Sequence, residues 1–342
     1  MKATKKIVGA ACALVAAVAL SAGSTFAWFT SNSNVTVGQI EATVVTMGGD
    51  LQIAIKSQTL ASGATEYTEG DLGSYSYKVE NPFATSPVLT AVTSVDGKAF
   101  TGRAASGATE TPSAVVNTTA TSGGYVKFTI SLRSTTNMTV YLDTASKVAS
   151  EPITGKPQTS IAAWKDIKKD DYGTNAVEVN SGDSISASAK NAVRVAFMVE
   201  GDEEAPDAKS QGKIWAPNEE SDNGGLGVAD GYSKGNLASD YEVNASGESS
   251  RAYTNVTTTN YTDNKLVPVT PVTAGTGGAT TDYSTATSSV ICTLEANTPK
   301  EVVICLWIEG RDGDCFNSIF TQSVKLDLAF HGEDIVDNTT SD

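Results

Sequence analysis

The chain is poor in histidine and in aromatic side chains. Its 342 residues include a single histidine, His331, and aromatic residues make up only 7% of the composition. A zinc site of the His-Glu-x-x-His type needs two histidines, and most serine and cysteine hydrolase sites need one placed in a cleft. We therefore expect no enzymatic activity, no catalytic residue and no zinc centre.

Positive charge is also scarce. The sequence has 24 Lys and Arg residues against 39 Asp and Glu residues, which gives a formal net charge of −15 and a pI near 4.5. An acidic surface repels polyanions and anionic lipid headgroups. Neither nucleic acid nor an anionic membrane is expected as a partner.

Long apolar stretches are missing beyond the N-terminus. Three lysines among the first six residues precede an apolar run over residues 7–20, and small residues lead to Thr25-Phe26-Ala27. This pattern is typical of a secretory signal peptide over residues 1–27, cut by signal peptidase after Ala27. The run is too short to span a bilayer, and no later stretch reaches 18 apolar residues. We expect a secreted chain, extracellular or at the cell surface, without a membrane span.

Cysteine is rare, with Cys292, Cys305 and Cys315 remaining after loss of the signal peptide. If residues 290–295 and 301–309 form a hairpin about Thr298-Pro299, Cys292 stands directly opposite Cys305. Directly opposed Cβ atoms lie within reach of a disulfide. A Cys305–Cys315 bridge and three reduced thiols are the alternatives.

The chain is rich in segments that alternate between apolar and polar residues. Alternation with period two is typical of strands that bury one face. Val302–Ile308 is apolar on both faces, so we expect a central strand there. The other expected strands are Gln39–Thr46, Leu51–Ile55, Ser74–Glu80, Val88–Val95, Val126–Arg133, Met138–Leu142, Val193–Val199 and Val324–Phe330.

Helical patterns are few. A short helix capped by Ser160 is expected over Ser160–Lys169, with one further turn at Asp314–Phe320. The region 201–284 is rich in Gly, Asn, Asp, Ser and Thr and breaks the strand rhythm. We expect an all-β protein: an antiparallel jelly-roll-like β-sandwich over residues 28–200 and 285–342. Residues 201–284 form a loop-rich insertion or a small subdomain.

Only one acidic cluster follows directly on an expected rigid strand. It contains Asp312 and Asp314, whose carboxylates suit calcium, although the twelve-residue spacing of an EF-hand is absent. A solvated acidic turn is the alternative. No other cofactor is expected.

The N-terminus of the secreted chain carries a recognisable motif. Phe26-Ala27-Trp28-Phe29-Thr30-Ser31-Asn32, followed by Gly38-Gln39-Ile40, resembles the start of exported proteins with SipW-dependent signal peptides. That family includes the TasA-like and camelysin-like proteins of biofilms. The segments Ala189–Phe197 and Val302–Ile319 also resemble blocks found in its members. The resemblance implies a Gram-positive source and a jelly-roll subunit that forms a homopolymer by donor-strand complementation.

The residues after the cleavage site suit such a donor strand. Trp28 and Phe29 form an apolar pair at the new terminus, and the segment up to Val37 contains no proline that would interrupt a ladder. Trp28, Phe29, Val35 and Val37 are the side chains expected to enter the neighbouring subunit. Alternatively, residues 28–37 form the first strand of their own sandwich.

Three functions remain open on the sequence. The first is a structural subunit of an extracellular filament or biofilm matrix. The second is a non-polymerising surface adhesin that binds through the insertion 201–284. The third, a camelysin-like metallopeptidase, is disfavoured because His331 lies at a polar position of an alternating strand, where an exposed or edge histidine is expected.

Overall fold

The structure is a computed structural model, and it describes part of the chain. The described residues are 35–46, 50–62, 64, 67–94, 97, 100–102, 124–154, 159–161, 184–186, 188–199, 212–217, 267–273, 289–309 and 317–335. The expected signal peptide, Trp28, Phe29, Cys315 and the pair Asp312 and Asp314 lie outside these residues.

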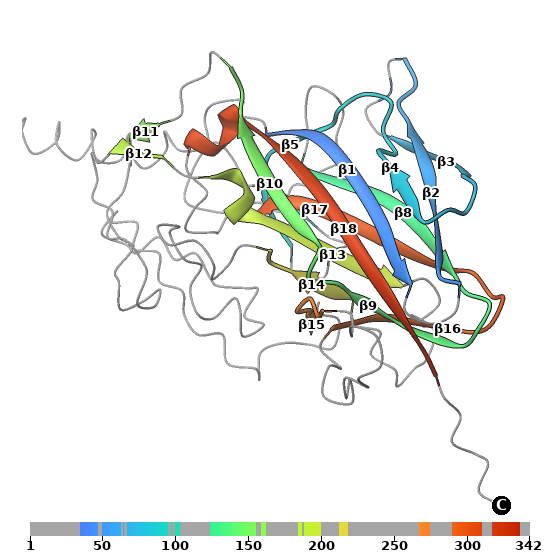
Figure 1. The fold of residues 1–342 in the computed structure, drawn as a ribbon. Helices are drawn as coiled ribbons and strands as arrows, with labels where there is room; N and C mark the ends of the chain where they lie inside the picture. Colours follow the sequence, from blue (N-terminus) through green and yellow to red (C-terminus); the bar gives the residue numbers. More distant parts are fainter. Residues whose placement is uncertain are drawn as a thin grey trace, which may run out of the picture.

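The first of two large sheets, sheet A, is organised around the last strand of the chain (Figure 1). Strand β18 (Gln322–Asp334) pairs on one side with β1 (Val35–Thr46) and on the other with β9 (Met138–Leu142) and β10 (Lys147–Pro152). Three shorter strands complete the sheet: β16 (Val290–Leu294) next to β9, and β4 (Lys78–Glu80) and β5 (Val88–Leu89) next to β1.

The second sheet, sheet B, is organised around β17 (Lys300–Glu309). This strand lies between β8 (Tyr125–Arg133) and β13 (Val193–Val199). Beyond β8 follow β2 (Gln52–Thr59) and β3 (Thr68–Leu72), and beyond β13 follow β14 (Lys213–Trp215) and β15 (Val267–Pro268). The short strand β6 (Ala91–Thr93) pairs with the end of β17, and β7 (Thr101–Gly102) pairs with β6.

The core lies between the two sheets and follows the alternation of the sequence. The buried side chains of β18 are Val324, Leu326, Leu328 and Phe330, and those of β8 are Val126, Phe128, Ile130 and Leu132. Burying one apolar side chain of this size is worth about 1.5–3 kcal/mol. The expected all-β sandwich is confirmed.

Sheet B also buries part of its outer face. Trp307 and Cys305 of β17 join a second apolar cluster with Ala196 and Ile214. Phe100 covers it by stacking on Tyr125, with ring centroids 3.7 Å apart, and by meeting the Trp307 ring edge-on. This second cluster explains why Val302–Ile308 is apolar on both faces and why β17 is central, as the sequence predicts.

The chain passes from one sheet to the other along both sides of the sandwich. On one side, the segment that includes β3 runs beside β2 in sheet B and continues into β4 of sheet A. On the other side, β15 pairs with β14, and Val272 a few residues later bridges to Asp143 beside sheet A. The pieces 212–217 and 267–273 of the expected insertion therefore belong to the sandwich.

Three expectations about local structure are wrong. The expected strand Val88–Val95 is divided, because β5 joins sheet A and β6 joins sheet B. Ser160 begins no helix, because Ser160–Ile161 forms strand β11, which pairs with β12 (Ser184–Ile185); residues 162–169 lie outside the described part. Strands β16 and β17 do not form a paired hairpin, because β16 joins sheet A and β17 joins sheet B. The expected turn near Phe320 is a 3-10 helix, η5 (Asn317–Thr321).

Candidate assembly surfaces

The N-terminal strand supplies two of the four expected donor residues. Val35 and Val37 are 0% and 1% exposed and lie in the core of their own chain. Residues 35–37 therefore begin the first described strand of their own sandwich, as the alternative prediction has it, and donation to a second copy stays a prediction. Trp28 and Phe29 precede the described residues.

Strand β1 is held on both sides. Its partner β18 runs parallel to it from Thr36 to Thr46, with one register shift near Gly38. On the other side β5 pairs with the start of β1 and β4 pairs with Glu41–Thr43. The Val37 N–H donates to the Pro87 carbonyl at 2.8 Å between these two pairings. Strand β1 therefore occupies an interior position of sheet A and is held there by backbone hydrogen bonds along both of its edges.

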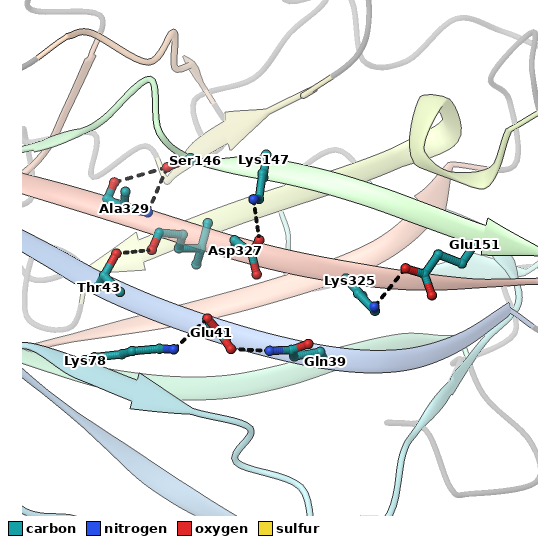
Figure 2. Close-up of polar contacts among 11 residues, drawn as sticks. Gln39, Glu41, Thr43, Lys78, Ser146, Lys147, Glu151, Lys325, Asp327 and Ala329 are labelled. Carbon is teal, nitrogen blue, oxygen red and sulfur yellow. Dashed lines mark hydrogen bonds and ion pairs between the residues drawn. The ribbon is translucent and has the colours of Figure 1, made fainter.

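The outer face of sheet A carries rows of opposite charges, shown in Figure 2. Lys78 Nζ lies 2.9 Å from Glu41 Oε2, and the hydrogen bond from Lys78 lowers the pKa of the Glu41 carboxyl. Gln39 also donates to Glu41. This part of the outer face is wet, as the alternation of Lys325 and Asp327 with apolar residues on β18 predicts.

Two of these rows cross from β18 to the outer strand β10. Lys147 Nζ lies 3.3 Å from Asp327 Oδ2, and Lys325 Nζ lies 2.8 Å from Glu151 Oε1. The hydrogen bond to Glu151 raises the pKa of Lys325. Strand β10 therefore presents a basic residue at one end and an acidic residue near the other.

A bulge separates β9 from β10 along β18. Residues 143–146 stand opposite only residues 328 and 329, because Leu142 pairs with Phe330 and Lys147 with Asp327. The Ser146 hydroxyl accepts a hydrogen bond from the Ala329 N–H at 2.9 Å and donates one to the Ala329 carbonyl at 3.1 Å (Figure 2). The Ala329 carbonyl also accepts from the Asp143 N–H at 2.9 Å, so the Ser146 side chain replaces the backbone acceptor for the Ala329 N–H.

His331 is not the exposed or edge residue that the alternation predicts. Its side chain is 0% exposed, its ring stacks on Tyr141 with centroids 5.2 Å apart, and its Nδ1 lies 3.0 Å from Asp143 Oδ2. Burial lowers the pKa of His331, and the nearby Asp143 carboxylate opposes that shift. The prediction is wrong because the outer face of sheet A is covered at this end, and the alternation of apolar and polar residues cannot reveal such a cover.

The cysteines do not face each other as expected. Cys292 of β16 stands opposite Val140, whereas Cys305 of β17 stands between Ala196 and Lys127 in the other sheet. Both side chains are buried. The expected register fails because the chain changes sheets between the two strands. The alternative partner, Cys315, is outside the described residues.

Metal ligands do not gather in the described part of the chain: it contains no group of three or more His, Cys, Asp or Glu residues placed to hold an ion. Asp312 and Asp314 are outside it, so calcium binding there stays a prediction.

Several outer strands leave one side of their backbone without a partner strand among the described residues, among them β4, β15 and β16. Two further ones are β10 at the border of sheet A and β3 at the border of sheet B. Sequence reasoning missed both strands, because Lys147–Pro152 and Thr68–Leu72 each hold a single large aliphatic residue. The only available signal was the spacing of Lys147 and Glu151, which places both side chains on one face of a strand.

No helix in the described residues is long and apolar enough to cross a membrane. Comparison with known proteins gives no further assignment: no family model, no curated protein and no solved structure matches this chain.

Proposed function

We propose that the chain is a secreted structural subunit of an extracellular filament or biofilm matrix. In this proposal each subunit donates its N-terminal strand to a neighbour, and the contact repeats head to tail without closing into a ring. The support is the motif at Trp28–Thr30, the all-β body, and the position of the first strand in its sheet.

The position of β1 carries the argument. It is the first described strand, yet it lies inside sheet A between β18 and the pair β4 and β5. A strand in the interior of a sheet can leave only if its departure drags no other element, and a strand near the chain terminus meets that condition. An equivalent segment from a second copy would then fit the same slot.

Exchange of this kind costs little at equilibrium. The side chains Val35 and Val37 would leave their own core and enter an identical one, so the burial lost is regained. Main-chain hydrogen bonds to β18 and β5 would be remade in the same way. Burial of Trp28 and Phe29 in the neighbour adds apolar contact and would favour the polymer over the monomer.

The experiment is removal of Trp28–Asn34, which leaves β1 intact from Val35 onward. We expect the shortened protein to be secreted and folded, by circular dichroism, but to form no fibres in negative-stain electron microscopy. A matched control replaces Thr30–Asn34 by other uncharged polar residues and keeps Trp28 and Phe29; it should polymerise. Fibres from the shortened protein at the yield of the unmodified chain would contradict the proposal.

A further inference from the structure

We propose that the side of β10 without a partner strand in the described residues is a second, two-fold contact, at which two copies of this chain pair antiparallel about Ala149. This lateral contact goes beyond the head-to-tail polymer, because it uses a different strand and does not involve the N-terminus. It rests on the backbone phase of β10 and on its charge pattern.

The backbone phase follows from a single hydrogen bond. The Ile153 N–H donates to the Thr321 carbonyl at 2.8 Å, in register with the pairing of Lys147–Pro152 to β18. In an antiparallel ladder, hydrogen-bonded pairs alternate with pairs whose N–H and C=O groups point away. Val148 and Ser150 therefore direct their backbone groups outward from sheet A.

The position of Pro152 agrees with this phase. Proline has no N–H, and within a sheet it is tolerated where that group would face away from the neighbouring strand. Pro152 occupies such an outward position and also ends the open stretch. The edge is therefore usable but short.

Two copies can satisfy these outward groups mutually. With Ala149 on the two-fold axis, Val148 of one copy stands opposite Ser150 of the second copy. Each of the two residues offers one N–H and one C=O, so the symmetric pair forms two hydrogen bonds at each of two positions, four in all. The result is one continuous sheet made of two copies of sheet A.

The charges of the edge match in the same register. Lys147 of one copy stands opposite Glu151 of the second copy, on the outer face where both side chains already lie (Figure 2). Directly opposed side chains have Cβ atoms about 5 Å apart. Each row then reads Asp327, Lys147, Glu151, Lys325 across the contact, with alternating sign.

A disulfide cross-link at the two-fold axis tests the contact. Ala149 is half-buried on the outer face, and the Ala149→Cys substitution places two thiols directly opposite each other in a non-hydrogen-bonded pair. Under copper-phenanthroline oxidation we expect a covalent dimer that dithiothreitol reverses, well above the level in the unmodified chain. The Glu80→Cys substitution on β4 is the matched control. Equal cross-linking at both positions would overturn the proposal.

Charge reversal gives an independent readout by sedimentation velocity. Lys147→Glu or Glu151→Lys alone places like charges opposite each other at both symmetric positions, and we expect each to weaken association roughly tenfold or more. An equimolar mixture of the two variants restores opposite charges at both positions and should associate again. Glu80→Lys, with the same change in net charge as Glu151→Lys, is the control. A mixture no better than its components would overturn the two-fold register.

The outcomes separate this contact from the polymer. Removal of Trp28–Asn34 should leave the cross-link of the Ala149→Cys variant intact, whereas the charge variants should still form single filaments. Loss of cross-linking upon that removal would show that the contact depends on polymerisation and would overturn its independence.

Discussion

Strands β10 and β3 border different sheets, and each has one backbone side without a partner strand in the described chain, but their charge patterns differ. Pairing β10 with a second copy about Ala149 sets Lys147 against Glu151. Strand β3 instead carries Glu69 and Asp71, both acidic and exposed, so its charges repel those of a second copy. Like charges directly opposite each other destabilise a sheet. The comparison shows that a single residue can decide whether the outer strand of a sheet repels a second copy of itself or pairs with it.

Many β proteins place charged residues on their outer strands, because these charges prevent aggregation through strand pairing. A chain that carries a net charge of −15 has many acidic residues available for this purpose. What distinguishes β10 is therefore the presence of Lys147 on an acidic protein. The following predictions test whether the two edges behave as differently as their charges imply.

The largest effect is expected from the core that both edges share. Phe128 is fully buried under the β3 side, where it meets Phe83 edge-on with centroids 6.3 Å apart. Phe128→Ala should lower the free energy of unfolding by about 3–5 kcal/mol. Urea denaturation followed by tryptophan fluorescence measures the loss. Hydrogen exchange should speed up at β10 as well as β3 if the sandwich unfolds as one unit; acceleration at β3 alone would divide the core into two units.

The next effect is a gain of association at β3. Asp71→Lys would give this edge one acidic and one basic side chain and remove the repulsion between two acidic copies. At about 0.2–1 kcal/mol for each cross-strand pair, we expect dimerisation to strengthen by about 1–2 kcal/mol in total. Sedimentation equilibrium measures it. Asp71→Asn removes the repulsion without adding attraction, so its dimerisation should fall between that of the unmodified chain and that of Asp71→Lys. If neither variant dimerises more strongly, steric hindrance and not charge keeps β3 from pairing with a second copy.

A smaller effect is expected from pH on the β10 side. Because burial holds the pKa of His331 below its value in the unfolded chain, the unfolded state binds more protons than the native state between the two values. Stability should therefore fall as the pH drops below about 6.5, by at most about 1.4 kcal/mol for each unit of difference between the two pKa values. His331→Gln should abolish this dependence, as urea titrations between pH 7.5 and 5.5 would measure. An unchanged slope in that variant would assign the pH dependence to other groups.

The smallest effect is expected from an ion pair on the β3 side. Lys56 Nζ lies 2.6 Å from Glu301 Oε2, and the hydrogen bond to Glu301 raises the pKa of Lys56. Both side chains are partly buried, so Lys56→Met should cost about 0.5–1 kcal/mol in urea denaturation. Lys325→Met, at the more exposed pair beside β10, should cost less. The reverse order would mean that the β10 rows stabilise the monomer more than the β3 side does.

Much of the fold was predictable from the sequence because burial imposes period two on every strand with one wet face. The alternation at Val324–Phe330, Val126–Arg133 and Val193–Val199 predicted strands that the structure has, and the apolar run Val302–Ile308 predicted the centre of sheet B. Short strands with few apolar residues, such as β3 and β10, escaped prediction because most of their stability comes from neighbouring strands.

The sites were less predictable. Trp28, Phe29, Asp312 and Asp314 fall outside the described residues, whereas Val35 and Val37 proved to belong to their own core. The expected Cys292–Cys305 pair failed because adjacency in sequence does not decide which sheet a strand joins. The prediction of an exposed or edge His331 was wrong, because a polar position of a strand is wet only if no other part of the protein covers it.

The sequence by itself determined that the chain is an all-β sandwich with an acidic surface, because side-chain alternation and composition are local properties. Only the tertiary structure decided that the first and last described strands run parallel in one sheet and that His331 lies against Asp143 and Tyr141. It also decided that β10 and β3 have no partner strand on one side within the described part of the chain. These features depend on which strands meet, and that is settled by how the two sheets bury their apolar faces together rather than by any single segment.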